Sequence, residues 1–256
     1  MPLLEVDHVS KEFGGLLATN DVSFNVNNGE IVCIIGPNGA GKTTIFNIIT
    51  GVYKINKGKI VFDEKNITNL KPRKIVESGI SRTFQNIRLF SGLRVIDNVL
   101  IGDHLSTNYS FINLLLRDKK FKSEETKAYQ KALEILESID LGDCIEAYAG
   151  DLPYGKQRRL EIARAIATGA KLLLLDEPAA GMNPQESDDL MKFVLNLRDR
   201  GYTILMIEHD MQMVMNISDR IYVMNYGKVI ANGTPKDIVS NKEVIHAYLG
   251  ESEDDE

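Results

Sequence analysis

The stretch GPNGAGKT at residues 36–43 constrains this chain more than any other feature of its sequence. It fits the pattern G-x-x-x-x-G-K-[ST] at every fixed position, and average residue frequencies give a chance match in such a chain a probability on the order of 1%. The mostly apolar run EIVCII (30–35) before it predicts a buried strand, and KTTIFNIIT (42–50) after it predicts a helix that ends at Gly51. A glycine-rich turn between a buried strand and a helix predicts a phosphate-binding loop.

The chemistry of such a loop follows from its backbone. Glycines let the chain turn sharply, so that successive N–H groups point inward, and the N-terminus of the following helix adds a partial positive charge. In this motif Lys42 reaches the β- and γ-phosphates, and Thr43 binds Mg²⁺. We therefore predict a site for ATP and Mg²⁺, in which Lys42 also stabilises the transferred phosphoryl group. The predicted binding residues are Gly36, Pro37, Asn38, Gly39, Ala40, Gly41, Lys42, Thr43 and Thr44.

A second stretch, LLLLDEP at 172–178, predicts the groups that complete this chemistry. Asp176 ends a buried strand, where a carboxylate can hold the Mg²⁺ shell. Glu177 would point away from the metal toward an attacking water, which it could polarise as general base. Taken alone, two acids before a helix are better explained as solvated side chains; the phosphate loop elsewhere in the chain favours the catalytic interpretation.

The remaining pattern predicts an α/β fold with a mainly parallel sheet flanked by helices. Asn183, Pro184 and Glu186 fit the N-cap, first and third positions of a helix whose apolar residues recur at helical spacing. The expected strands are 3–9, 22–26, 30–35, 58–63, 171–176 and 202–207, the expected helices 42–50, about 155–168 and 183–200, and the expected hairpin 220–233 with its turn at 225–227.

Residues 86–155 interrupt this pattern and predict an inserted helical subdomain. In SEETKAYQKALEILESI (123–139) the apolar residues fall near one helical face and the charges on the other. Ser123 could be the N-cap, but Thr126 stands where a capping box needs Glu or Gln, so the start of this helix stays open. NLLLRDKKFK (113–122) predicts a helix end and an exposed basic turn, which fits a solvated face better than a binding site.

Composition narrows the class of protein. The net charge of −6 argues weakly against a dedicated nucleic-acid binder, and two cysteines, Cys33 and Cys144, are too few for a disulfide framework, which favours a reducing compartment. The N-terminus lacks the basic and apolar regions of a signal peptide, and no uncharged apolar run approaches the roughly 18 residues of a membrane helix. Work at a membrane would therefore require docking to another molecule. The acidic residues within 251–256 predict a solvated tail.

With these motifs in place, the chain resembles the ATP-binding subunits of ABC transporters, in motif order and over almost its whole length. The phrases TFQNIRLFSGLRVIDNVLIG, LPYGKQRRLEIARA and LLLLDEPAAGMNPQE, with the insert around 104–122, are similar to the ATPases of high-affinity branched-chain amino acid importers. The transported solute rests on this resemblance alone, because such a subunit does not touch the amino acid.

The resemblance implies roles for residues outside the phosphate loop. Gln85 in TFQNIRLF matches a glutamine that ligates Mg²⁺ and senses the membrane subunits, and His209 in IEHDM matches a catalytic histidine that contacts the γ-phosphate. Phe13 matches the aromatic residue that stacks on adenine. In AAGMN (179–183), Asn183 replaces the aspartate that the family uses in a loop crossing to a partner subunit.

The loop LPYGK at 152–156 departs from the family pattern. In the family, two chains face head to tail, and a serine of this loop donates to the γ-phosphate bound by the other chain. Pro153 holds that position here and cannot donate. The resemblance then implies that the phosphate is bound by the backbone N–H groups of Tyr154 and Gly155, by the helix N-terminus, and by the charged group of Lys156. We expect Lys156→Gln to weaken ATP-driven dimerisation.

The fold implied by the resemblance is a P-loop NTPase core with a mainly parallel sheet, an N-terminal antiparallel β part and an inserted helical subdomain. The core would comprise residues 1–85 and 156–250, the helical subdomain residues 86–155, and the acidic tail residues 251–256. The whole chain would be a single ABC ATPase domain.

The implied protein is an ATP-hydrolysing subunit bound peripherally at the cytoplasmic face of the cell membrane. Its implied partners are membrane-spanning permease subunits, a second ATPase chain of the same or a different kind and, indirectly, a solute-binding protein; no nucleic acid is expected. Leu89, Phe90 and Leu93 either dock to the permease or pack inside the helical part. The alternative is an ABC-type ATPase that serves another transporter, or nucleic acid or ribosomes, although those usually carry two ATPase halves or long coiled coils.

Overall fold

The computed structural model describes residues 1–103 and 119–249, which form two compact units. The first unit consists of Met1–Arg82 and Leu172–Glu256, and the second of Thr83–Lys171. The predicted helical subdomain, residues 86–155, lies inside the second unit, which extends further because helix α6 (Tyr154–Ala167) packs against its other helices. None of the described helices is both long enough and apolar enough to cross a membrane.

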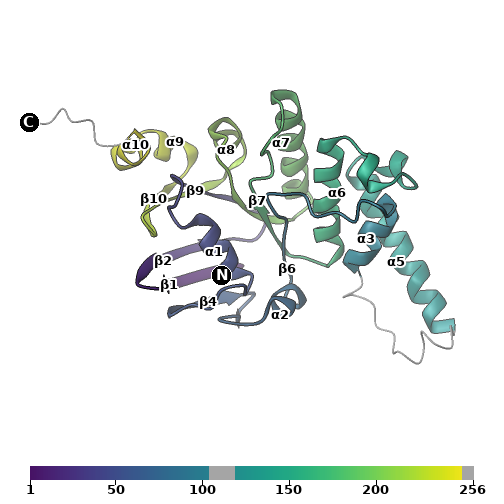
Figure 1. Ribbon diagram of the computed structural model, residues 1–256, viewed down its shortest axis with the longest axis horizontal. Helices are drawn as coiled ribbons and strands as arrows, with labels where there is room; N and C mark the ends of the chain where they lie inside the picture. The colour runs from purple at the N-terminus through teal and green to yellow at the C-terminus, as the bar shows by residue number, and fades with distance from the viewer. Residues whose placement is uncertain (104–118, 250–256) are drawn as a thin grey trace, which may run out of the picture. The chain divides into compact units, whose positions relative to one another are not determined.

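The larger sheet of the first unit runs parallel except at its edge strand β10 (Figure 1). Its strands, in the order β10-β9-β3-β8-β7-β6, are Lys228–Gly233, Arg220–Asn225, Ile31–Ile35, Thr203–Ile207, Leu172–Asp176 and Ile80–Arg82. Every residue of β3, β7 and β8 is buried, as expected for parallel strands that are covered on both faces. The predicted mainly parallel sheet is confirmed.

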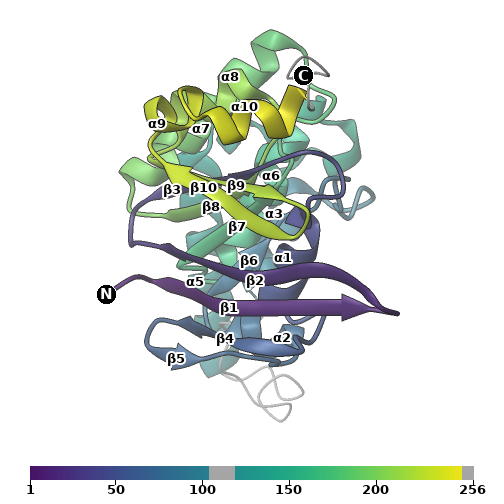
Figure 2. The same ribbon diagram turned by 90° about the vertical axis from the view of Figure 1, so that its left-hand side faces the viewer.

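The smaller sheet of the first unit is antiparallel and N-terminal, as the resemblance implied. It has the order β2-β1-β4-β5, formed by Leu16–Val26, Leu4–Phe13, Lys57–Phe62 and Lys65–Asn66. Helix α1 (Lys42–Ile49) lies between the two sheets (Figure 2). Its Ile45, Phe46 and Ile49 are buried in one apolar core with side chains of both sheets. This packing holds α1, and with it the loop that precedes α1.

The other face of the larger sheet carries α7 (Pro184–Asp199) and α8 (Met211–Ile217) (Figure 1). The start of α7 confirms the predicted cap: the side chain of Asn183 accepts from the Glu186 N–H, and the Glu186 carboxylate accepts from the Asn183 N–H, both at 3.0 Å. The remaining helices of this unit are α2 (Pro72–Glu77), α9 (Pro235–Val239) and α10 (Lys242–Leu249).

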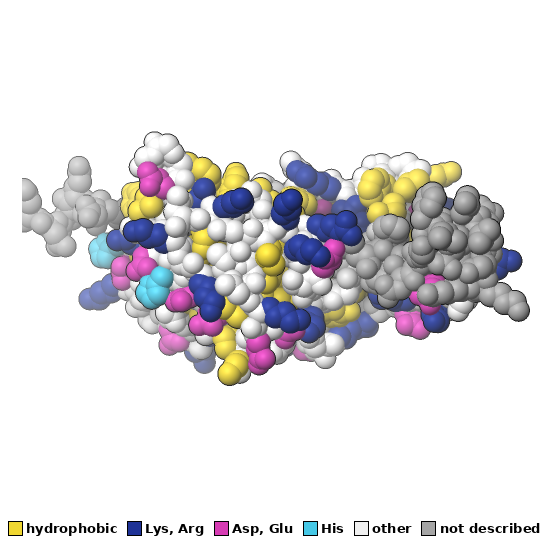
Figure 3. All heavy atoms as spheres, turned by 90° about the horizontal axis from the view of Figure 1, so that it is seen from below, with side chains coloured by type: hydrophobic (Ala, Val, Ile, Leu, Met, Phe, Trp, Pro, Cys, Tyr) yellow, Lys and Arg dark blue, Asp and Glu magenta, His cyan; other side chains and the backbone are white. Residues whose placement is uncertain are grey.

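The outer face of the first unit, around β4 and β5, is charged and mixed in sign. Figure 3 views this face and shows Lys and Arg side chains interspersed with Asp and Glu. Lys57, Lys59 and Lys65 are exposed there, beside the exposed Glu64. Side chains of both signs on an outward sheet face favour solvation rather than a single-sign binding field.

The second unit packs α3 (Val95–Asp103), α5 (Lys119–Ser138) and α6 together. The suggestion that Ser123 is an N-cap is wrong, because α5 already begins at Lys119 and Ser123 lies within it. Residues 119–122 of the predicted basic turn are helical for the same reason, since Lys is a good helix former and nothing in KKFK stops the helix. The rest of that prediction, 113–118, lies outside the described residues.

Candidate functional site

The phosphate loop connects the end of the central strand β3 to α1. Gly36, Gly39 and Gly41 all have positive φ, at 148°, 81° and 99°, which a residue with a Cβ adopts only with strain. A Cβ on Gly36 would lie 2.0 Å from the Met224 carbonyl oxygen, and one on Gly41 2.6 Å from that of Ala18. Gly36 and Gly41 are therefore required both by the turn and by the close packing of the loop on its neighbours.

The turn between β9 and β10 supports this loop from outside. The Gly227 N–H donates to the Ala40 carbonyl at 3.0 Å, and the Gly227 carbonyl accepts from the Asn20 N–H at 2.7 Å. One turn residue thus connects the phosphate loop to β2, while the neighbouring Tyr226 is 86% exposed.

Lys42 is the buried cation of this site. Its Nζ donates to the carbonyl oxygens of Gly36 at 2.7 Å and Pro37 at 3.0 Å, and the residue is only 6% exposed. The pKa of the Lys42 ammonium lies below its usual value because burial disfavours the charged form, and the negative charge of Glu177 opposes this shift. The loop thus holds its lysine over its own backbone, within electrostatic reach of Glu177. The exposed Thr43 and half-buried Thr44 follow it in α1.

Asp176 ends β7 and is buried in an ion pair. Its Oδ2 lies 2.6 Å from Nη2 of Arg82, and the two side chains are 7% and 6% exposed. An oxygen donor of this kind, together with the Thr43 hydroxyl at the start of α1, is the hard ligand chemistry that Mg²⁺ prefers. The donor set fits the metal that the resemblance implies.

Glu177 and His209 form a contact between neighbouring strand ends. Oε1 of Glu177 lies 2.9 Å from Nε2 of His209, and the Glu177 N–H donates to the Ile207 carbonyl at 2.9 Å. Glu177 has a φ of 48°, a left-handed conformation that costs a non-glycine residue about 1–3 kcal/mol. Since β7 and β8 are adjacent and parallel, both side chains come from the same edge of the sheet. This geometry fits a carboxylate base that is oriented by a histidine.

Glu208 is a buried carboxylate that the sequence analysis missed. It is 4% exposed and accepts from the N–H groups of Ala179 and His209, each at 2.8 Å. Burial raises the pKa of Glu208, and these backbone N–H groups oppose the shift. Glu208 thereby ties the start of the 179–183 loop to the backbone beside His209. An acid directly between a buried strand and a predicted catalytic histidine was the available signal.

Phe13 lies at the end of β1 and is 40% exposed. Tyr53 packs edge-on against its ring, with the centroids 5.0 Å apart, and Nζ of Lys11 lies 4.7 Å from the centroid of Phe13. A half-exposed ring held by two neighbours can serve as a flat platform for a base.

Gln85 belongs to the second unit, where α6 fixes its backbone. Arg158 is fully buried and donates to the carbonyl oxygens of Phe84 at 2.7 Å and Gln85 at 2.8 Å. Glu161 pairs with Arg158 at 2.9 Å and accepts from the Arg88 N–H at 3.2 Å. The exposed Gln85 side chain therefore projects from a segment that is anchored by a buried ion pair, a second feature that the sequence analysis missed.

The start of α6 presents the other predicted binding residues. Pro153 is the N-cap without a side-chain hydrogen bond, Tyr154 is 38% exposed, and a Cβ on Gly155 would meet nothing within 4 Å. Lys156 lies 3.3 Å from a carboxylate oxygen of Asp143. Its Nζ is also 3.1 Å from Sγ of Cys144. The thiol of Cys144 and then the Asp143 carboxylate raise the pKa of Lys156.

The predicted residues fall into two groups. The first unit brings together the phosphate loop with Lys42, Asp176, Glu177 and His209 at the carboxyl edge of its parallel sheet, the usual location of sites in such folds. The second unit carries Gln85, Tyr154, Gly155 and Lys156.

Comparisons with known proteins identify the family of this chain. A model of the ABC transporter family matches residues 19–180, and one of the branched-chain amino acid ATP-binding cassette transporters matches residues 228–254. The chain is 46% identical over 252 residues to the high-affinity branched-chain amino acid transport ATP-binding protein BraF of Pseudomonas aeruginosa, covering 98% of this chain and 99% of that protein. It is 38% identical to the probable branched-chain amino acid transport ATP-binding protein LivG of Methanocaldococcus jannaschii, covering 98% of each.

Among solved structures, the ADP conformation of MJ1267, an ATP-binding cassette of an ABC transporter, has a TM-score of 0.85 at 38% identity and covers 98% of this chain and 100% of that one. The ABC transporter model alone matches more than half of the chain. The chain therefore belongs to the ABC transporter family, as one of its ATP-hydrolysing subunits.

Proposed function

We propose that this ATPase powers an importer of branched-chain amino acids and hydrolyses ATP at the carboxyl edge of the larger sheet. The observation that carries the catalytic part is the contact of Glu177 with His209 at 2.9 Å, within electrostatic reach of Lys42. The amino acid is proposed from the relatives, two of which are named as branched-chain amino acid transport ATP-binding proteins.

The binding of ATP divides between three parts of the first unit. The 40% exposed Phe13 stacks on the adenine, and stacking of this kind is worth roughly 1–3 kcal/mol per base. The backbone N–H groups of residues 36–44 and the N-terminus of α1 bind the phosphates. Lys42 exchanges its carbonyl partners in the loop for phosphate oxygens of higher negative charge.

Magnesium would be held by Thr43 and Asp176, with Gln85 as a further ligand. When bound, it neutralises charge on the β- and γ-phosphates. The buried position of Asp176 and the exposed hydroxyl of Thr43 at the loop support this assignment.

Glu177 takes a proton from the attacking water as general base. His209, in contact with Oε1 of Glu177, orients the carboxylate. Its contact with the γ-phosphate is carried over from the family resemblance. Lys42 stabilises the negative charge that the transferred phosphoryl group carries. The left-handed backbone of Glu177 is compatible with this role, since strained residues are often found at active sites.

The second unit supplies the contacts to partners. In this proposal the exposed start of α6, with Tyr154, Gly155 and Lys156, closes on the ATP of a second ATPase chain, which is either a copy or a different subunit. Phe90 and Leu93 are 49% and 39% exposed, which supports docking to a permease rather than packing inside the helical part. The ATPase would then sit peripherally at the cytoplasmic face of the membrane, coupled through the permease to a solute-binding protein.

The test is Glu177→Gln. Loss of a general base should lower the rate of ATP hydrolysis about 10²- to 10⁴-fold, while ATP binding is retained. The exposed Glu5→Gln serves as a control that changes the same charge elsewhere. Hydrolysis within a few fold of the unsubstituted chain would rule out Glu177 as the base. Light scattering on Glu177→Gln with ATP then asks whether two copies close. A monomer would mean that closure needs a different ATPase chain or the membrane subunits.

A further inference from the structure

Arg82 is a buried arginine that neither the motifs nor the proposed mechanism uses. It ends β6, and its guanidinium spans two other elements of the first unit. Nη2 donates to Oδ2 of Asp176 at 2.6 Å, Nη1 donates to Oδ1 of Asn47 at 2.7 Å, and the guanidinium carbon lies 5.5 Å from the centroid of the Phe46 ring. Since the Arg82 side chain is only 6% exposed, these contacts form away from solvent.

The two elements that Arg82 joins are those that carry the proposed magnesium ligands. Asn47 and Phe46 follow Thr43 by four and three residues in α1, so all three lie on the same side of that helix. Asp176 ends β7, the direct parallel neighbour of β6. One side chain therefore contacts both the helix face below Thr43 and the carboxylate of Asp176.

We propose that Arg82 is a positioning residue for the magnesium site: it fixes the Asp176 carboxylate relative to the start of α1. This inference rests on the proposed function, because it assumes that Thr43 and Asp176 share a metal ion. Arg82 acts through the orientation of Asp176 and does not itself touch the metal.

The physical basis is the planar fork of arginine. Two nitrogens of one rigid group bind an oxygen on β7 and an oxygen on α1, so a shift of either element breaks a charge-assisted hydrogen bond. Lysine would offer a single nitrogen in place of the planar fork, so it would not hold the two oxygens in the same fixed geometry. Groups that orient metal ligands from behind typically change metal affinity by about 10- to 100-fold when they are removed.

The alternative is that Arg82 only neutralises the buried charge of Asp176. The two roles predict opposite outcomes. A positive charge that merely competes with the metal would, once removed, leave Mg²⁺ binding unchanged or tighter. A positioning group would, once removed, leave Mg²⁺ binding weaker. Asn47 separates the roles further, since Asn47→Ala keeps every charge and removes only the anchor of Arg82 on α1.

The experiment measures Mg²⁺ titrations of a fluorescent ATP analogue bound to full-length Glu177→Gln protein, which prevents turnover. Adding Arg82→Gln should raise the Mg²⁺ concentration at half-saturation about 10- to 100-fold. Adding Asn47→Ala should raise this concentration by a smaller factor. Adding Arg82→Lys should give a concentration between that of Arg82→Gln and that of the protein with Arg82 intact. If Arg82→Gln fails to fold, Asn47→Ala and Arg82→Lys decide the question.

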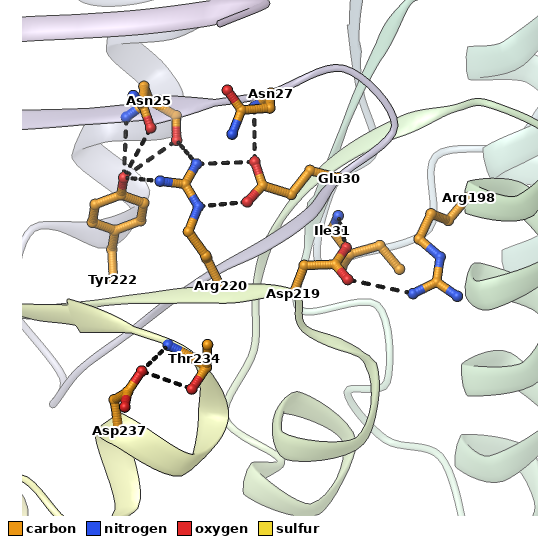
Figure 4. A network of polar contacts seen from close by, with 10 residues as sticks. All are labelled: Asn25, Asn27, Glu30, Ile31, Arg198, Asp219, Arg220, Tyr222, Thr234 and Asp237. Atoms are coloured by element: carbon orange, nitrogen blue, oxygen red, sulfur yellow. Dashed lines mark hydrogen bonds and ion pairs between the residues drawn. The ribbon is translucent and has the colours of Figure 1, made fainter.

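The matched control is Arg220→Gln, which breaks another arginine network of the same unit away from the site. Figure 4 shows Arg220 between Glu30, Asn25 and Tyr222, and its Nη2 lies 2.9 Å from Oε2 of Glu30. This variant should lower the melting temperature and leave the Mg²⁺ titration unchanged. An equal change in the control would assign the Arg82 effect to general destabilisation and overturn the proposal.

Two further outcomes also count against the proposal: unchanged or tighter Mg²⁺ binding in folded Arg82→Gln, and an unaffected titration in Asn47→Ala. Binding of the analogue at saturating Mg²⁺ is measured first. A failure of the parent protein to bind it even there would count against the nucleotide site itself and would leave the role of Arg82 to be judged by direct Mg²⁺ binding.

Discussion

Lys42 and Lys156 carry the same charged group in opposite surroundings. Lys42 is buried and bound by carbonyl oxygens of its own loop, and burial lowers its pKa. The Lys156 side chain is 35% exposed and paired with Asp143 and Cys144, which raise its pKa. Both were predicted to bind phosphate. The comparison teaches that a backbone loop can fix a cation for chemistry, whereas a surface pair leaves it exchanging between partners and water.

The largest effect is expected at the buried member. Lys42→Ala should weaken ATP binding about 10- to 150-fold, because a hydrogen bond to a charged group is worth about 1.5–3 kcal/mol. A fluorescence titration with an ATP analogue measures this, with the exposed Lys59→Gln as control for the loss of one positive charge. An ATP affinity within twofold of that of the parent chain would contradict the comparison, since Lys42 would then bind only the carbonyl oxygens of its own loop.

A buried anion next to the site sharpens the comparison through pH. Burial raises the pKa of Glu208 above the 4.5 of an ordinary glutamate, so the folded chain keeps this proton to higher pH than the unfolded chain does. The stability that Glu208 contributes is therefore full below pH 4.5 and is lost as the pH rises through its folded pKa.

Glu208→Gln has no charge to desolvate, and it keeps an oxygen acceptor for only one of the two N–H groups, of Ala179 and His209, that Oε1 and Oε2 bind. The lost acceptor lowers stability by an amount that does not depend on pH, so the pH dependence reports the charge. The melting temperature of Glu208→Gln minus that of the parent chain should therefore increase by roughly a few degrees as the pH is raised from 4.5 into the neutral range. Thermal unfolding at a series of pH values measures this gain. A pH-independent difference would show that the charge of Glu208 is already fully stabilised by its N–H donors.

The smallest effect is expected at the exposed member. Lys156→Gln should weaken ATP-driven dimerisation by less than about fivefold, in line with the ~0–1 kcal/mol typical of exposed ion pairs. Light scattering in the Glu177→Gln background measures the dimer, and Arg73→Gln, which removes another exposed pair, is the control. A loss as large as that of Lys42→Ala would mean that Lys156 leaves Asp143 on closure and binds phosphate as strongly as the buried lysine does.

The sequence analysis succeeded where the determining interactions are local. The glycines of the phosphate loop, the buried run of β3 and the Asn183–Glu186 cap each act within a few residues, so their patterns are visible in one stretch. Phe90 was left between two interpretations because its exposure depends on how the second unit packs, and the structure places it half exposed.

What the sequence could not show depends on distant partners. Arg82 precedes Asp176 by 94 residues, and Arg158 clamps the carbonyls of Phe84 and Gln85 from 74 and 73 residues away. Nothing in the spacing of these residues marks them, because each looks like an ordinary charged residue until the strands and helices are assembled. Arg82 and Arg158, which were missed, thus contact predicted site residues and do not form separate sites.

The turn at Gly227 has a consequence for observing this ATPase at work. Its amide proton is held by the Ala40 carbonyl inside the phosphate loop, although the turn projects into solvent at Tyr226. Exchange of that proton with deuterated solvent should be slowed only while the loop keeps its shape. The exchange rate of this single amide, which lies outside the nucleotide site and can be followed by mass spectrometry or NMR, thereby reports how often the loop opens.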